Sequence, residues 1–396
     1  DCLHFEEISI QAAGLWRAET VTISGLTGSQ TPSGSLALRA GSCGDKLGSQ
    51  GAWTQGAGQL VLTVGAGGLA AGASCVVGFD LVNPAVAQAS PAVSIEADAA
   101  VDAHDVGREA MSKNGSALYG VANGTDPLTV VVPTFSTKAM GQSTPKTGAT
   151  NSITVSLAAN IDLAAGASAT SVTITGLTGS ATSTTSSLAL ATAACDKFGA
   201  TGDWHSDGTL TLTLAATLAA NTECVISFAL TNPSAAQASP AVSVGAALTD
   251  GSVSIGAIAA AAMSKPGTAV YGVANGADPL LVVVVSACTV DNAVLPCSFG
   301  GCIFSLVQDN VLQRNGTCAG QAGNLYLNSR GIKTVPADVF HNMGSLETIR
   351  LSSNQLQALP VNRLLPLTRL SSLSCQGNPD LLCPPSEVSS RGGAAV

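Results

Sequence analysis

Hydrophobic and polar residues alternate along several short stretches of this chain. In residues 209–214, leucines occupy every second position and threonines the positions between them. Alternation directs one side of a strand to a core and the other to solvent, which is typical of antiparallel sheets. The alanines of residues 257–263 could instead form one helical turn. Between Gly, Pro, Asn and Asp, further strands are predicted near residues 151–158, 172–175, 187–191, 224–231, 241–248, 252–258, 268–274 and 280–286.

Motifs from the first part of the chain recur 149 to 152 residues later. VTISGLTGS at residues 21–29 returns as VTITGLTGS at residues 172–180. YGVANG at residues 119–124 returns unchanged at residues 271–276, and the shorter motifs SLAL, AQASP and AMSK also occur twice. Self-similarity on this scale predicts one fold used twice in succession.

About nine short strands per copy favour a β-sandwich. Trp53 and Trp204 each lie between two cysteines of their copy, an order similar to that of immunoglobulin domains, although these cysteines are closer together in sequence. We therefore expect a mainly β fold of two tandem immunoglobulin-like β-sandwich repeats and a short leucine-rich repeat solenoid cap. The expected domains are a first repeat in residues 1–134, a second repeat in residues 135–285 and a C-terminal region in residues 286–396.

The C-terminal region has its own hydrophobic period of 24 residues. The pattern Leu346-x-x-Ile349-x-Leu351-x-x-Asn354-x-Leu356 resembles the leucine-rich repeat consensus. The resemblance covers roughly residues 320–380 and implies inward-facing leucines and asparagines that bond to the backbone. Cysteines on both sides of it resemble those that flank leucine-rich repeats in extracellular proteins.

Eleven cysteines indicate a disulfide-stabilised chain. Each repeat has its own pair, and repeated pairs most simply form one disulfide per repeat, closing a loop of roughly 30 residues and worth on the order of 3 kcal/mol. The pairs are Cys43 with Cys75 and Cys195 with Cys224. Six further cysteines belong to the C-terminal region and their connectivity stays open: Cys288, Cys297, Cys302, Cys318, Cys375 and Cys383.

Cys2 is the cysteine left over, and an unpaired cysteine in a secreted chain favours an intermolecular disulfide. The alternative is that Cys2 pairs within the chain and another cysteine is free. Three Asn-Gly-Ser/Thr tripeptides, at Asn114, Asn123 and Asn315, are candidate N-glycosylation sites. Together these features predict an extracellular or cell-surface glycoprotein, with Asp1 as the first residue of the mature chain.

Composition excludes some partners. Charged residues make up 10% of the chain and its net charge is −9, so no basic surface for nucleic acid is expected. The longest strongly apolar run, residues 280–285, is far shorter than the ~20 residues of a membrane-spanning helix. Residues 1–285 hold 19 acidic and 9 basic side chains, against 6 and 7 in residues 286–396. Two interpretations of this asymmetry stay open. The acidic excess serves solubility, or it gives a weak electrostatic attraction between one end of the chain and the other end of a neighbouring copy in an assembly.

No catalytic, metal-binding or cofactor-binding residue is predicted. The four histidines lie in unrelated contexts, and the chain has no phosphate loop, His-Glu-x-x-His motif or dinucleotide fingerprint. One acidic stretch could bind calcium, but a solvated acidic surface is the favoured interpretation. Its members are Glu96, Asp98, Asp102, Asp105 and Glu109.

The sequence thus predicts a secreted structural protein that self-assembles into a filament, hair or coat, with itself or other extracellular matrix and surface proteins as partners. Gly-Leu-Thr-Gly-Ser and Thr-Asn-Pro in the repeats resemble units of secreted surface proteins of unicellular algae and other protists, among them the flagellar hairs called mastigonemes. The alternative is an adhesion protein whose leucine-rich repeats bind a protein or glycan. A glycan-active enzyme is the third hypothesis, and it lacks a defensible carboxylate pair.

Overall fold

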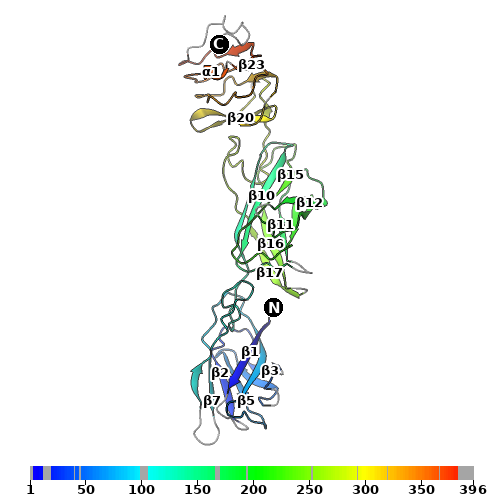
Figure 1. Cartoon of the computed structure of the whole chain (residues 1–396), viewed down its shortest axis with the longest axis vertical. Helices are drawn as coiled ribbons and strands as arrows, with labels where there is room; N and C mark the ends of the chain where they lie inside the picture. Colours follow the sequence, from blue (N-terminus) through cyan, green and yellow to red (C-terminus); the bar gives the residue numbers. More distant parts are fainter. Residues whose placement is uncertain are drawn as a thin grey trace.

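The computed structural model describes residues 3–11, 19–39, 41–43, 46–98, 106–165, 170–192, 195–250, 253–291, 293–318, 320–364 and 366–381. In this part of the chain, strands and turns dominate, and the helical elements are α1 (Val361–Leu364) and the 3-10 turn η1 (Gln308–Asn310). The predicted mainly β fold is therefore confirmed. Figure 1 shows the strands in separate groups that follow one another along one long axis.

The first repeat contains an eight-stranded sheet in the order β1-β6-β3-β4-β5-β2-β7-β8, which places β1 at one edge. β3 pairs with β4 through its first residues and with β6 through Leu38 and Arg39, so it joins two sets of strands. The strands are β1 (Leu3–Gln11), β2 (Thr20–Ser24), β3 (Gly34–Arg39), β4 (Gln50–Thr54), β5 (Gln59–Thr63), β6 (Ser74–Val82), β7 (Ser94–Asp98) and β8 (Val106–Ala110).

The second repeat contains a nine-stranded sheet in the order β17-β16-β11-β14-β13-β12-β15-β10-β9. β12 pairs with both β13 and β15, as β3 does with β4 and β6. The strands are β9 (Phe135–Gln142), β10 (Thr150–Ala159), β11 (Ser171–Thr175), β12 (Thr185–Ala191), β13 (Thr201–His205), β14 (Thr209–Thr213), β15 (Cys224–Thr231), β16 (Ser243–Asp250) and β17 (Val253–Ala262).

Alternation in these strands builds a separate hydrophobic core in each repeat. Leu210 and Leu212 of β14 are fully buried, whereas the threonines beside them are half-buried or exposed. Trp204 is fully buried and its indole Nε1 donates a hydrogen bond to the carbonyl of Thr182 at 3.1 Å. The buried indole thus satisfies its polar atom while filling the core, as buried tryptophans usually do.

One predicted strand of the second repeat is wrong. Residues 268–274 contain a turn, because Tyr271 and Gly272 have φ values of 51° and 72°. These angles lie in the left-handed region, which an extended strand excludes. The YGVANG motif therefore marks a turn, although its alternating apolar residues suggest a strand.

Two other stretches also differ from the prediction. Residues 280–286 pair only through isolated bridges at Val282 and Val283 and through the first residue of β18, and Leu280 has a φ of 53°. The alanine-rich residues 257–262 extend β17, so no helical turn forms there. Their small side chains fit a strand because pairing with β16 supplies the backbone hydrogen bonds.

The C-terminal region has a four-stranded sheet and a three-stranded sheet. The strands of the first are β18 (Ser286–Ala287), β19 (Cys297–Phe299), β20 (Cys302–Val307) and β21 (Val311–Gly316). Those of the second, all parallel, are β22 (Gly323–Tyr326), β23 (Leu346–Arg350) and β24 (Ser372–Ser374). Leu325 pairs with Ile349 and Ile349 with Leu373, so the register reproduces the 24-residue period.

Candidate functional site

Each repeat is closed by its own disulfide. Cys43 is bonded to Cys75 and Cys195 to Cys224, across sequence separations of 32 and 29 residues. Cys224 begins β15 and Cys75 is the second residue of β6, so each bridge ties an equivalent strand to a preceding loop. Both strand cysteines are almost fully buried.

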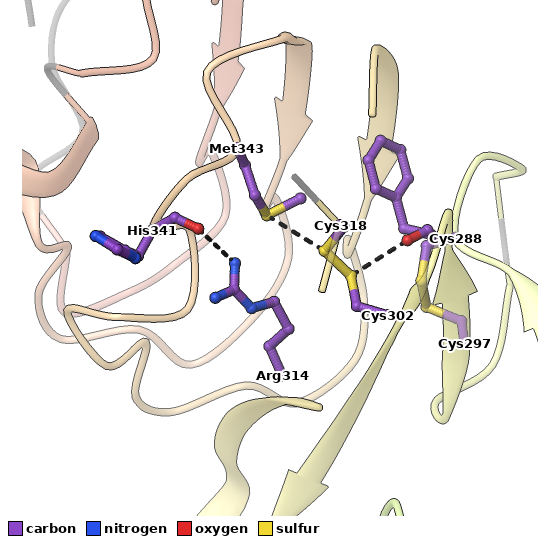
Figure 2. The surroundings of a disulfide bond; sticks show 8 residues. Cys288, Cys297, Cys302, Arg314, Cys318, His341 and Met343 are labelled. Carbon is purple, nitrogen blue, oxygen red and sulfur yellow. Dashed lines mark hydrogen bonds between the residues drawn. A yellow bond between two sulfur atoms is a disulfide. The ribbon is translucent and has the colours of Figure 1, made fainter. Parts of the chain in front are cut away.

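The four leading cysteines of the C-terminal region form two consecutive pairs, Cys288–Cys297 and Cys302–Cys318. Figure 2 shows the two bridges near each other beside the leucine-rich segment. The sulfur of Cys318 lies 3.9 Å from the sulfur of Met343, which is fully buried. The four cysteines therefore belong to the same hydrophobic cluster as the leucines. The sequence had left their pairing open.

Three cysteines remain, and one of them, Cys2, is the expected site of a disulfide between copies. Cys375 is also disulfide-bonded. Cys383 and Cys2 lie outside the described residues, so the expected intermolecular role of Cys2 stays a prediction.

The three glycosylation acceptors differ in their surroundings. Asn114 and Asn123 are exposed, and Asn123 adopts a left-handed φ of 56°. Asn315 is half-buried in β21, opposite Ile303. The two sites of the first repeat are therefore the more accessible to a modifying enzyme.

The acidic stretch is only partly described, because Asp102 and Asp105 lie outside the described residues. Glu96 accepts two hydrogen bonds from Arg108, and this partner lowers the pKa of the Glu96 carboxyl. Among the described residues, no group of three or more His, Cys, Asp or Glu side chains could hold a metal ion. Nor does any helix in the described ranges have the length and apolar character needed to cross a membrane.

The repeated YGVANG motif forms the same tight turn in both repeats. Tyr119 and Gly120 have φ values of 49° and 73°, close to those of Tyr271 and Gly272. Backbone hydrogen bonds close each turn in both directions, between Leu118 and Val121 and between Val270 and Val273. Two consecutive positive φ values define a type I′ turn, for which glycine is well suited. We call residues 118–121 and 270–273 the joint turns.

The first joint turn packs against the second repeat. The amide of Asp162 donates to the carbonyl of Tyr119 at 2.8 Å. A Cβ at Gly120 would lie 2.2 Å from Asp162 Oδ1 and 2.7 Å from Ala220 Cβ, so only glycine permits this approach. Asp162 Oδ1 also accepts from the amide of Ala220 at 2.7 Å, which fixes the carboxylate in place.

The second joint turn packs against the C-terminal region. A Cβ at Gly272 would lie 2.9 Å from the carbonyl oxygen of Leu306 and 3.0 Å from Ser305 Cβ, both in β20. The same turn therefore contacts the next unit of the chain twice, against two unrelated surfaces. The sequence shows that the motif occurs twice. Its only hint of these contacts is that a glycine follows the tyrosine in both copies.

The leucine-rich sheet presents a polar surface beside its buried side. Leu325 and Ile349 are fully buried, whereas Arg350 remains exposed on the opposite side of β23. The Arg350 guanidinium lies 4.6 Å from the ring centroid of Tyr326 and forms an ion pair with Asp291 at 3.0 Å. The other residues on this surface are Asn324, Thr348, Ser372 and Ser374.

Asn354 and Asn378 stabilise the backbone of the leucine-rich segment. Asn354 Nδ2 donates to the carbonyls of Leu327 and Leu351 at 2.8 and 2.9 Å, and its Oδ1 accepts from the amides of Arg330 and Ile332. Asn378 repeats part of this pattern one turn later, with donation to the Leu351 carbonyl at 3.0 Å. This is the backbone-bonding role that the consensus implies for its asparagines.

Comparison with known proteins supports this segment alone. A leucine rich repeat model matches residues 323–379, so the predicted C-terminal leucine-rich repeats are present. No curated protein matches the chain. One similar solved structure is a glycosyl hydrolase family 2 member from Bacteroides cellulosilyticus, with 9% identity and a TM-score of 0.18. The match covers 94% of this chain but 39% of that one, and a TM-score this low supports no argument about activity.

Proposed function

We propose that this chain is an extracellular structural subunit that self-assembles into a filament, hair or coat. The observation that carries the proposal is the repeated use of the joint turns, which seat Gly120 and Gly272 against the unit that follows. A turn used twice in this way favours end-to-end stacking of units. The arrangement along one long axis in Figure 1 suits such a role.

The finer architecture belongs to this proposal. β3 and β12 each pair with two sets of strands around one core, which favours an immunoglobulin-like sandwich in each repeat. The parallel strands β22 to β24 favour a short solenoid cap that docks to a neighbouring subunit. Boundaries at residues 134 and 285 then separate three domains.

Disulfide content and low charge support secretion and assembly. Four described disulfides suit an oxidising compartment. A charged fraction of 10% keeps self-repulsion low when copies associate. Cys2 is the candidate for a covalent link between copies, and mastigoneme-like surface hairs are a suitable setting.

Electron microscopy and light scattering of the purified chain test the proposal. We expect concentration-dependent growth of regular filaments or sheets, and a disulfide-linked dimer band on a gel without reductant. The Cys2→Ser variant should lose that band, whereas its melting temperature should stay unchanged. Discrete monomers at every concentration and salt condition would contradict self-assembly.

The second candidate function is adhesion or recognition through the leucine-rich repeats. The polar surface with Tyr326 and Arg350 favours it, because aromatic and arginine side chains are enriched at binding hot spots. Arrays of glycans and of extracellular proteins test it with the full chain. Arg350→Ala should abolish binding, whereas the exposed Arg369→Ala should retain it. A chain that binds no partner on either array would exclude this alternative.

A further inference from the structure

The leucine-rich segment departs from its own repeat at Arg330. Asn354 and Asn378 lie 24 residues apart, and Arg330 occupies the position 24 residues before Asn354. Arginine has several donors but no acceptor, so it cannot accept from backbone amides as Asn354 Oδ1 does. The first turn of the segment therefore has a charged group where the later turns have an amide that stabilises the backbone.

This charged group is not satisfied within the chain. Nε and Nη2 of Arg330 are buried and, in the described part of the chain, have no hydrogen-bond partner. The same holds for Oδ1 of Asn328, two residues earlier. Burial lowers the pKa of the Arg330 guanidinium, and the negative charge of Asp291 opposes that change. Buried polar groups in native structures usually have partners, so these atoms favour a ligand that supplies both acceptors and a donor.

A second guanidinium lies at the same end of the sheet. Arg350 pairs with Tyr326 across β23 and β22, and its guanidinium lies 4.6 Å from the centroid of the Tyr326 ring. Arg350 Nη1 donates to both carboxylate oxygens of Asp291, at 3.3 and 3.0 Å. One carboxylate thus faces two guanidinium groups, which leaves positive charge in excess. We call Tyr326, Asn328, Arg330 and Arg350 the arginine corner.

Asp291 reaches the arginine corner from a short loop. The disulfide between Cys288 and Cys297 closes this loop (Figure 2), and the amide of Tyr326 donates to the Cys288 carbonyl at 2.8 Å. The side chains of Arg350 and Asp291 are 44% and 55% exposed. Ion pairs between side chains this exposed contribute little to stability. A carboxylate from another molecule can therefore replace Asp291 at small cost.

The other end of the molecule carries carboxylates that suit this exchange. Figure 1 shows β7 near one end of the long axis and β23 near the other. β7 pairs with β8, and their exposed side chains include Asp98 and Glu109. The two repeats together hold 19 acidic and 9 basic side chains, against 6 and 7 in the C-terminal region. Such complementarity favours contact between the C-terminal region of one copy and the first repeat of the next.

From these observations we infer that the arginine corner binds an acidic peptide segment from the first repeat of another copy, and that Asp291 occupies the corner as an internal substitute in the free chain. A carboxylate of the segment replaces Asp291 at Arg350, and a backbone amide of the segment supplies a donor for Asn328. The contact joins unlike surfaces at opposite ends of the molecule, which favours growth into an open filament. The inference rests on the proposed function for the source of the segment.

A synthetic peptide with the sequence of residues 94–110 tests the inference on the full chain. At concentrations too low for assembly, we expect saturable binding of one peptide per chain that weakens as salt is added. A peptide in which asparagine and glutamine replace every aspartate and glutamate should not bind. Equal binding of the two peptides, or no binding of the acidic one, would overturn the inference. Binding of dextran sulfate alone would also overturn it, since the corner would then recognise a polyanionic glycan.

Variants of the chain separate recognition from a structural role. Asp291→Asn removes the internal carboxylate, so peptide affinity should rise about tenfold. Its melting temperature should change little, because the disulfide still closes the loop. Arg350→Ala should lower the affinity about tenfold, whereas the exposed Arg369→Ala should leave it unchanged. If Asp291 only anchors its loop, Asp291→Asn lowers the melting temperature without a gain in affinity, and that result contradicts the inference.

Self-assembly is measured separately by light scattering. The Asp98→Asn/Glu109→Gln chain should need about tenfold more protein to assemble, whereas Glu223→Gln, at an exposed site of the second repeat, should behave as the unaltered chain. A chain that assembles but does not bind the peptide defeats this inference and leaves the proposed function standing. A chain that binds the peptide but never assembles defeats the proposed function and the assignment of the segment to another copy, while the acidic-peptide site stands.

Discussion

At the scale of single residues, Asn354 shows how one side chain supports a whole turn of backbone. Its amide group makes hydrogen bonds to five backbone groups in two successive repeats, and it is 4% exposed. Asn354→Ala would remove the side-chain partner of the Arg330 and Ile332 amides and of the Leu327 carbonyl, whereas the Leu351 carbonyl would keep its bond from Asn378. We expect the free energy of unfolding of the C-terminal region to fall by about 3 kcal/mol, measured by calorimetry or denaturant titration.

Gln357→Ala is the matched control for that substitution. Gln357 is exposed in the same segment, so loss of its amide should change stability by less than about 0.5 kcal/mol. Equal effects of the two substitutions would show that Asn354 does not stabilise the turn through its hydrogen bonds.

At the scale of elements, the joint turn depends on the lack of a side chain at Gly120. Gly120→Ala places a methyl group against Asp162 and Ala220 and should separate the first repeat from the second. We expect a broader range of shapes in small-angle X-ray scattering and faster proteolysis between the repeats.

Gly148→Ala separates this contact from simple backbone strain. Gly148 also has a positive φ, 64°, but a Cβ there would meet nothing within 4 Å. This variant should lose some stability through the backbone and keep the shape of the unaltered chain. If both variants change the scattering profile equally, the joint turn does not set the spacing of the repeats.

The disulfides are also best judged as links between elements. Replacement of Cys195 and Cys224 by alanine opens a loop closed across 29 residues. Loop entropy then predicts a loss of about 3–4 kcal/mol for the second repeat. Thermal unfolding of this variant, beside the Cys43→Ala/Cys75→Ala chain, should show a shift confined to the repeat that lost its bridge. A shift in both repeats from one replacement would argue against separate cores.

At the scale of the whole molecule, three hydrophobic clusters divide the chain. In the described part of the chain they belong to the first repeat, the second repeat and the C-terminal region, with Val121 and Val131 of the first repeat packed against the second cluster. Units that share little apolar surface unfold separately. We expect calorimetry to resolve more than one thermal transition. A single transition whose calorimetric and van't Hoff enthalpies agree would contradict this expectation.

Local periodicity explains why so much of the architecture follows from sequence. Side chains alternate in a strand whatever its partner, so residues 209–214 predict β14 directly. The 24-residue period likewise predicts which leucines lie side by side in β22, β23 and β24. β13 was not predicted from the sequence. In TGDWH the buried positions of the alternating pattern are Gly202 and Trp204, and glycine gives no hydrophobic signal.

Tertiary structure alone decided which of these elements meet. The turn at Tyr271 and Gly272 looks like a strand in sequence, because alternation cannot report the sign of φ. Pairing of Cys288 with Cys297 depends on the fold of β18 and β19, since the four leading cysteines of the C-terminal region allow three pairings and their spacing selects none of them. The contacts of Gly120 with Asp162 and Ala220 arise between residues far apart in the chain. Sequence determined the repeated β unit and the leucine-rich segment because both are local patterns, and packing decided where they touch.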